Sequence, residues 1–454
     1  MNQHIFREYD IRGVVGTDLS DAVVSDVALG IGAFMRGRGV TRISIGRDAR
    51  ESSPRFRDIL IEGLNQSGCD VLDAGMVPTP LLYYTLFTQP VGGGVMITGS
   101  HNPADNNGFK ICYDKSTVFG EHITEIRDII ASRKFNEPGS GKVDEVDVIP
   151  EYLDYVFSNV KLGARKLKVV VDSGNGMGGI VAVPLYRRMG CEVVELFTDP
   201  DSRFPNHHPD PTVVENMRSV AQTVIETGAD FGIAFDGDAD RIGVVDERGR
   251  IIWGDRLMII YARSILKYHP GATFIAEVKC SDTLFQEIRE KGGNPIMWRV
   301  GHSPIKAKMK ESGALLAGEM SGHQFFADQY FGYDDAIYAG ARLLEIISKT
   351  DGPVSSLLDG LPETVFTPEI RVDCSDDKKF EVVTALTEEF KKTHPVIDID
   401  GARIVFDGGW GLVRASNTQP VLVLRFEARN QDLLDRIRSE VEGKLAGVIG
   451  SKSS

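Results

Sequence analysis

A serine stands at the end of a predicted buried strand, where its hydroxyl could do chemistry. The run 91–97 is apolar and glycine-rich, and Thr98-Gly-Ser-His-Asn-Pro103 follows it directly. Open α/β sheets bind ligands in loops at the carboxyl ends of their strands, so Ser100 could act there as a nucleophile. Three asparagines, Gly108 and Lys110 come next and surround one hydroxyl with hydrogen-bonding groups and a cation. Taken alone, Thr-Gly-Ser would also fit a simple turn.

A second loop carries three carboxylates at alternate positions, Asp236, Asp238 and Asp240, after a predicted strand at 229–235. Carboxylates that converge in this way are hard oxygen ligands for Mg²⁺, Mn²⁺ or Ca²⁺. An EF-hand is excluded because Arg241 occupies the sixth position, where that loop requires glycine. A solvated acidic turn without a metal is the remaining alternative.

Two further loops offer groups that recognise sugars and phosphates. The first, 318–323, presents Glu319, Ser321 and His323, which can hydrogen bond to sugar hydroxyls. The second packs Arg414, Ser416, Asn417 and Thr418 into five residues, as a phosphate-binding loop would. Either could be an ordinary loop. The glycine-rich segment 172–179 does not match the G-x-G-x-x-G dinucleotide motif, and we interpret it as a structural turn.

Composition narrows the possible partners and compartment. The 454 residues carry a net charge of −14, which argues against a nucleic-acid or membrane partner. An anionic small substrate would need a locally basic cleft. Five scattered cysteines without a Cys-x-x-Cys pattern indicate neither a disulfide framework nor a zinc site. We therefore expect a cytoplasmic protein with neither a signal peptide nor a membrane span.

The elements that must position these loops follow a pattern that repeats three times. Each segment contains a strand, a helical stretch and a second strand that ends in a polar, glycine-containing loop. We predict three related α/β domains at 1–147, 148–252 and 253–366, whose loops face one cleft. From about Thr367 the pattern changes, and we predict a C-terminal α+β domain at 367–454.

The four loops, in this order, resemble those of the α-D-phosphohexomutase family, most closely its bacterial phosphomannomutase/phosphoglucomutase branch. Three further segments also look like family segments, and together they extend the resemblance over almost the whole chain: Phe6–Gly13, Phe204–Pro211 and Gly301–Lys306. The resemblance implies three similar α/β domains with mixed sheets and a C-terminal α+β domain, arranged in a heart shape around one cleft.

The resemblance also implies an activity, the reversible interconversion of hexose 1-phosphate and hexose 6-phosphate, with mannose or glucose or both as the sugar. Ser100 would be phosphorylated. Mg²⁺ would lie on Asp236, Asp238 and Asp240, with a phosphoserine oxygen of Ser100 completing its shell. A hexose 1,6-bisphosphate would be the intermediate and the activator. We expect a monomer or a weak dimer.

Residue roles follow from the chemistry that such a transfer requires. Lys110, Arg241, Arg12 and His101 are candidate cations or donors near the transferred group. Lys110, His302 and His323 are candidates for proton transfer, and the sequence alone does not rank them. The predicted substrate contacts are Tyr9, Lys279, Glu319, Ser321, His323, Arg414, Ser416, Asn417 and Thr418.

Other functions compete with this interpretation. The protein could be a phosphoglucosamine mutase, a metal-dependent sugar phosphatase that hydrolyses a phosphoserine intermediate, or a non-catalytic protein that binds sugar phosphates. Ser100 and the three aspartates argue against the last alternative, because binding alone does not require them.

Overall fold

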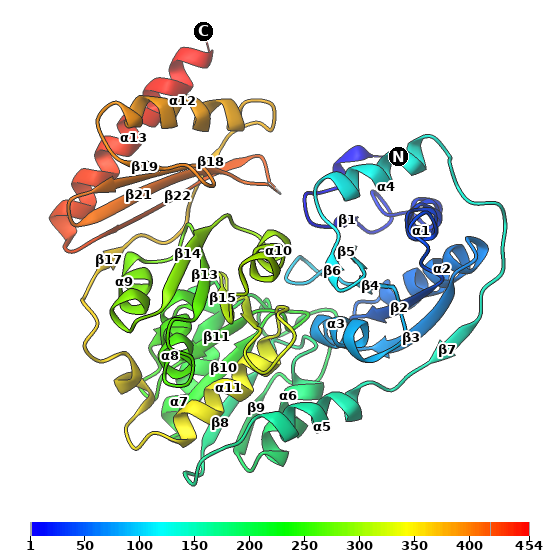
Figure 1. Cartoon of the computed structure of the whole chain (residues 1–454), viewed down its shortest axis with the longest axis horizontal. Helices are drawn as coiled ribbons and strands as arrows, with labels where there is room; N and C mark the ends of the chain where they lie inside the picture. The colour runs from blue at the N-terminus through cyan, green and yellow to red at the C-terminus, as the bar shows by residue number, and fades with distance from the viewer. Residues whose placement is uncertain (1, 418, 454) are drawn as a thin grey trace.

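The computed structural model describes residues 2–417 and 419–453. Thr418, one of the predicted phosphate contacts, lies outside the described residues. Figure 1 shows the first domain in blue and cyan on one side, the C-terminal domain in orange and red opposite it, and the second and third domains in green and yellow between them. Four separate sheets form the cores of these domains, and the predicted fold class is confirmed.

The first domain is built on a mixed sheet of strand order β1-β5-β4-β2-β3-β7, with β6 paired to β5. Strand β4 is buried at every position, as its apolar run predicts. The elements are η1 (Gln3–Ile5), β1 (Ile11–Val14), α1 (Asp21–Arg36), β2 (Arg42–Arg47), α2 (Ser53–Gln66), β3 (Asp70–Met76), α3 (Thr79–Thr88), β4 (Gly93–Ile97), β5 (Asn106–Tyr113), β6 (Ser116–Thr117), α4 (Glu121–Ala131) and β7 (Val143–Glu145).

The second domain has the strand order β12-β11-β10-β8-β9, and the third has β14-β13-β15-β16. The elements of the second are α5 (Ile149–Asn159), β8 (Lys168–Asp172), α6 (Gly179–Arg188), β9 (Glu192–Leu196), η2 (Val214–Met217), α7 (Arg218–Thr227), β10 (Phe231–Phe235), β11 (Ile242–Val245) and β12 (Ile251–Ile252). Those of the third are α8 (Gly254–Leu266), β13 (Thr273–Glu277), α9 (Asp282–Glu290), β14 (Asn294–Trp298), α10 (His302–Ser312), β15 (Leu316–Gly318), β16 (Gln324–Phe326), α11 (Ala336–Ser348) and η3 (Val354–Leu358).

The three predicted loops occupy the same place in their domains. The Ser100 loop joins β4 to β5, the aspartate loop joins β10 to β11, and the Glu319 loop joins β15 to β16. In each pair the second strand runs antiparallel to the first. Each chain therefore reverses at the end of its sheet and presents its loop there, which explains how three separate motifs reach one site.

The C-terminal domain is an antiparallel sheet of order β17-β22-β21-β20-β19, with β18 also paired to β22. Its predicted phosphate contacts begin with Arg414 near the end of β21 and continue into the turn that follows. The elements are β17 (Val365–Phe366), β18 (Ile370–Asp373), α12 (Lys379–Lys391), β19 (Val396–Ile397), β20 (Ala402–Phe406), β21 (Gly409–Ala415), β22 (Val421–Ala428) and α13 (Gln431–Ser453).

The packing of apolar side chains joins the first three domains and leaves the fourth separate. Helix α3 carries Tyr83 and Tyr84 from the first domain onto Tyr333 and Tyr152, with ring centroids 5.6 and 5.5 Å apart. These residues belong to one apolar cluster that runs through the second and third domains. The C-terminal domain has its own core between its sheet and helices α12 and α13. It meets the third domain at a small cluster that includes Trp410.

In the described part of the chain, every helix is too short or too polar to span a bilayer.

Candidate active site

The Ser100 loop holds its serine in a strained conformation that directs the hydroxyl toward the aspartate loop. Ser100 has a φ of 47°, in the left-handed region that non-glycine residues seldom adopt. Its Oγ donates to Asp236 Oδ2 at 2.9 Å and lies 3.1 Å from His101 Nδ1. The Ser100 side chain is buried. Two motifs 136 residues apart in the sequence are thus in direct contact.

The aspartate loop gathers three buried carboxylates. Asp236, Asp238 and Asp240 each offer an oxygen, and these atoms lie within 4.8 Å of one another. All three side chains are at most 1 % exposed. Asp238 Oδ1 has no hydrogen-bond partner among the described residues, although it is buried. An orphaned oxygen in a convergent carboxylate group fits a divalent cation that prefers oxygen ligands.

Buried cations offset this concentration of negative charge. Lys110 extends from β5 in the first domain, and its Nζ donates to Asp238 Oδ2 at 2.6 Å and to Asp240 Oδ2. Arg241 donates through Nε to Asp236 Oδ2 at 3.0 Å. Burial raises the pKa of Asp236 to about 7, while Arg241 opposes the shift. Each of the three carboxylates thus has a cationic neighbour that partly offsets the cost of its burial.

His323 connects the aspartate loop to the Glu319 loop. Its Nδ1 lies 2.7 Å from Glu319 Oε2, and its Nε2 lies 3.2 Å from Asp240 Oδ1. Burial alone would lower the pKa of His323, but the two carboxylates raise it to about 10. Glu319 also accepts a hydrogen bond from the Gly301 N–H at 2.7 Å. His323 is therefore a cation at neutral pH, held by carboxylates on both sides.

His302 begins helix α10 and is buried, so it is not a surface histidine. Its ring centroid lies 5.7 Å from that of His323. Its Nδ1 lies 3.4 Å from Lys306 Nζ and 3.6 Å from Asp334 Oδ2. Burial, with Lys306 nearby, holds the pKa of His302 well below its usual range. His302 is therefore neutral and differs in charge from His323.

Arg12 and His101 lie near the same carboxylates, but neither is an unpaired cation. The Arg12 guanidinium forms an ion pair with Asp10, two residues before it in the chain. Burial, with Arg241 nearby, holds the pKa of His101 well below its usual range, so this histidine is a neutral hydrogen-bonding group. Arg12 retains a partly exposed edge for an anionic ligand.

The loop of the C-terminal domain faces the first domain. Asn417 Nδ2 donates to Tyr9 Oη at 2.8 Å, and Tyr9 Oη donates to the Val300 carbonyl at 3.0 Å. Arg414 is buried beside Asp400, with 3.2 Å between Nε and Oδ2. Ser416 Oγ accepts from the Gln419 N–H at 3.2 Å. Arg414 thus lies at the end of β21, Ser416 and Asn417 lie in the turn after it, and Asn417 contacts Tyr9.

Lys279 and Ser321 lie at the edge of the same region. Lys279 Nζ is 3.4 Å from Glu369 Oε2 and 3.9 Å from Glu277 Oε1. Ser321 Oγ lies 3.2 Å from His323 Nδ1. Ser321 thus belongs to the Glu319 loop and faces its histidine, whereas Lys279 lies among carboxylates of neighbouring segments, and their role in sugar binding stays a prediction.

Models of four consecutive domains match this chain. They are the phosphoglucomutase/phosphomannomutase α/β/α domains I, II and III and the C-terminal domain, at residues 3–137, 150–249, 253–365 and 369–444. The chain belongs to the phosphoglucomutase/phosphomannomutase family. The predicted fold and the predicted class, an isomerase that interconverts hexose phosphates, are confirmed by this membership. The exact domain limits predicted above stay predictions.

Similar proteins agree with the family. A Pseudomonas putida phosphomannomutase/phosphoglucomutase is 46% identical over 447 residues, 98% of this chain and 96% of that protein. A Neisseria gonorrhoeae phosphoglucomutase is 45% identical over 443 residues, 97% of this chain and 96% of that protein. The crystal structure of a Burkholderia thailandensis family protein has a TM-score of 0.93 at 43% identity and covers 99% of this chain and 98% of that one.

Several residues of this phosphohexomutase site carried no predicted role. Asp210 accepts from Arg241 Nη1 at 3.3 Å. Asp334 and Lys306 face His302, and Arg50 contacts the Ser100 loop. Asp210 and Lys306 lie in two of the family segments named above, and Arg50 follows the end of β2. A polar residue at a strand end or in a family segment was the sequence signal that could have indicated a role for them.

The glycine-rich turn at 172–179 supports the aspartate loop. The Met177 N–H donates to the Gly237 carbonyl at 2.9 Å. A Cβ on Gly176 would lie 2.7 Å from that same carbonyl oxygen, so only glycine fits there. The segment is a structural turn that packs behind the carboxylates.

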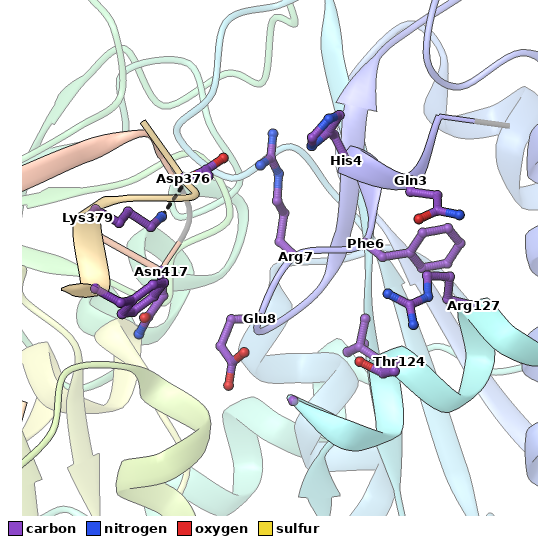
Figure 2. Close-up of a pocket in the computed structure, with 13 residues that line it drawn as sticks. Gln3, His4, Phe6, Arg7, Glu8, Thr124, Arg127, Asp376, Lys379 and Asn417 are labelled. Carbon is purple, nitrogen blue, oxygen red and sulfur yellow. Dashed lines mark hydrogen bonds and ion pairs between the residues drawn. The ribbon is translucent and has the colours of Figure 1, made fainter. Parts of the chain in front are cut away.

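A cavity of about 320 Å³ opens between the first and fourth domains, beside Asn417. Figure 2 shows His4, Arg7 and Glu8 on one side of it and Asp376 and Lys379 on the other. Neither Ser100 nor the three aspartates line it. Its position next to Asn417 makes it a flank of the C-terminal loop, not the place where Ser100 acts.

Proposed function

We propose that Ser100 is the phosphoryl donor and acceptor in a reversible interconversion of hexose 1-phosphate and hexose 6-phosphate. The observation that carries this proposal is the 2.9 Å contact between Ser100 Oγ and Asp236 Oδ2, within the group of three carboxylates. Phosphorylated Ser100 would transfer its phosphoryl group to the free hydroxyl of the sugar phosphate. The resulting hexose 1,6-bisphosphate would turn over and return its other phosphoryl group to Ser100.

Asp236, Asp238 and Asp240 would hold Mg²⁺ together with an oxygen of phosphorylated Ser100. When bound, the cation would neutralise charge that builds up on the transferring phosphoryl group. Two observations support this metal site: the three carboxylates converge, and a buried oxygen of Asp238 has no hydrogen-bond partner among the described residues. Lys110 and Arg241 add fixed positive charge on either side of the loop.

We assign proton acceptance from the sugar hydroxyl to His302. It is neutral and buried, and its Nδ1 faces Lys306 and Asp334, which fix the ring. His323 is protonated, and its two N–H groups face Glu319 and Asp240, so it is better suited to hold Glu319 in place than to accept a proton.

Arg414, Ser416 and Asn417 would bind the phosphate that is not being transferred. A mutase accepts its sugar in two orientations, so this site must recognise a phosphate and little else. The three residues offer a guanidinium, a hydroxyl and an amide, and none is an acid. Thr418 is included in this proposal from the sequence alone.

We propose mannose and glucose phosphates as substrates. The sequence Gly-Glu-Met-Ser-Gly-His at 318–323 supports this choice. A relative named phosphomannomutase/phosphoglucomutase, 46% identical to this chain, supports it as well. We place the enzyme in the cytoplasm, which is consistent with five free cysteines.

The test is to supply mannose 1-phosphate or glucose 1-phosphate with Mg²⁺ and a trace of hexose 1,6-bisphosphate, and to identify the product. We expect the 6-phosphate of both sugars. Release of inorganic phosphate would favour a phosphatase, and strong preference for glucosamine phosphate would favour a phosphoglucosamine mutase. Intact-mass measurement should show a phosphorylated fraction that is absent from Ser100→Ala, which should also lose turnover.

A further inference from the structure

Arg50 is a buried arginine that lies behind the Ser100 loop without contributing to any of the four predicted loops. It follows β2, is 50 residues from Ser100 in the sequence, and is only 2 % exposed. Burial of a guanidinium has a high desolvation cost, and the hydrogen bonds of Arg50 must offset this cost. These bonds therefore indicate the role of the side chain.

All five N–H groups of the Arg50 side chain are used, and four of them bind the Ser100 loop. Nη2 donates to the carbonyls of Ser100 and Asn102 at 2.9 and 2.7 Å. Nη1 donates to the Asn106 carbonyl at 2.9 Å and to the Pro103 carbonyl. Nε donates to Asp48 Oδ2 at 3.2 Å. One planar group therefore fixes four carbonyls of a loop that has little regular structure.

The Ser100 carbonyl is confined from its other side by the aspartate loop. A Cβ on Gly237 would lie 2.2 Å from Ser100 O, so the two backbones touch there. Arg50 thus holds the Ser100 carbonyl where it packs against the backbone of the aspartate loop, which carries Asp236.

Gly99 and Phe204 also lie close to the guanidinium. A Cβ on Gly99 would lie 2.4 Å from Arg50 Cζ, so only glycine lets the loop approach this closely. The ring of Phe204, from the second domain, has its centroid 5.4 Å from the same carbon atom. Asp48, which orients Arg50, also accepts from the Gly99 N–H at 3.1 Å.

We propose that Arg50 is a positioning residue for phosphoryl transfer, which holds the Ser100 loop so that Oγ stays in register with the aspartate loop. The inference rests on the proposed role of Ser100. Arg50 acts through the loop backbone and has no contact with the Ser100 hydroxyl. Lysine cannot replace it, since one ammonium group with three donors cannot reach four carbonyls and a carboxylate.

The test compares Arg50→Lys with a matched control, Arg342→Lys. Arg342 is a buried arginine of the third domain that donates to Asp328 Oδ2 at 2.6 Å and to the Asp328 carbonyl at 2.9 Å. Protein phosphorylated on Ser100 is mixed with glucose 1-phosphate, and the single-turnover rate of dephosphorylation is measured. Binding of glucose 1-phosphate to the dephosphorylated protein and the thermal midpoint are measured in parallel.

We expect Arg50→Lys to slow the transfer about 100-fold, because a misplacement of about 1 Å has an effect of this size. Binding of glucose 1-phosphate should stay within about twofold of wild type, since the C-terminal loop is untouched. Arg342→Lys should lower the thermal midpoint about as much as Arg50→Lys does, but it should transfer the phosphoryl group at the wild-type rate.

Gly99→Ala provides a second route to the same answer if Arg50→Lys does not fold. It keeps the guanidinium but pushes the loop away from it, and it should also slow the transfer. Wild-type transfer rates in either variant, or an equal loss in Arg342→Lys, would overturn the inference. Failure of the proposed function would be recognised separately, because wild-type protein would then carry no phosphoryl group to transfer.

Discussion

Removal of the Tyr9 hydroxyl tests how the C-terminal domain engages the rest of the enzyme. Tyr9 Oη accepts from Asn417 at 2.8 Å and donates to the Val300 carbonyl at 3.0 Å. Burial raises the pKa of Tyr9, so the hydroxyl stays protonated under ordinary assay conditions. Tyr9→Phe keeps the ring, which lies over Gly301 and beside His302 at 5.8 Å between centroids, and removes only the two hydrogen bonds.

The size of the effect follows from which domains these bonds connect. Each neutral hydrogen bond contributes about 0.5–1.5 kcal/mol. The bond to Val300 joins the first and third domains, which a shared apolar core already holds together. The bond from Asn417 joins the first domain to the fourth, which has a separate core. Loss of the Asn417 bond, about 0.5–1.5 kcal/mol in placing the C-terminal loop, should lower kcat/KM about 2- to 13-fold.

The assay follows glucose 6-phosphate formation with a coupled dehydrogenase, and Tyr261→Phe is the control. Tyr261 is buried and donates to the Ala339 carbonyl at 2.8 Å, so its variant also loses a hydrogen bond, but away from the site. It should lower the thermal midpoint and leave kcat/KM unchanged. A double-mutant cycle of Tyr9→Phe with Asn417→Ala should show a coupling free energy of at least about 0.5 kcal/mol. If Tyr9→Phe keeps kcat/KM within twofold, or if the two variants are additive, the reasoning is wrong.

Three further predictions concern the metal, the distal phosphate and a buried acid. Chelation should abolish turnover until Mg²⁺ is restored, and full activity in the presence of a chelator would contradict the metal site. Asp240→Asn should lower kcat about 100-fold or more while the far-ultraviolet circular dichroism spectrum is unchanged. Arg414→Ala should lower kcat/KM about 10- to 100-fold for mannose and glucose phosphates alike, through the loss of a charge-assisted contact, and loss for one sugar only would assign the loop differently. Burial raises the pKa of Asp335 from 3.8 to about 6. Folding therefore favours its protonated form, so wild type should lose up to roughly 3 kcal/mol of unfolding free energy relative to Asp335→Asn as the pH rises from about 4 to above 6. Denaturant unfolding at both ends of that range measures the difference, which would be constant if the shift were absent.

The sequence predicted the local features of the site well, because each depends on residues close together in the chain. The three carboxylates lie within five residues, and the turn at Ser100 follows an apolar strand. Strand-end loops of one repeated pattern were enough to predict that the motifs meet. The reversal of the chain after each loop could not be read from the separate segments, since it depends on how the following strand pairs.

The contacts that complete the site could not be predicted, because they join distant parts of the chain. Lys110 reaches Asp240 across 130 residues, and Tyr9 meets Asn417 across 408. Arg50 stood at a strand end like many surface arginines, and only the carbonyls facing it distinguish it. The difference in charge between His302 and His323 depends on burial and on neighbours from other elements, which residue types do not reveal.

The separate core of the C-terminal domain has a consequence for how this family can diversify. The core between the sheet of the C-terminal domain and helices α12 and α13 shares no residue with the apolar cluster that runs through the other domains. We therefore expect substitutions in this core to leave the packing around Ser100 and the aspartates largely unchanged. If the C-terminal loop binds the distal phosphate as proposed, the residues that capture the ligand can change more freely than those of the transfer step.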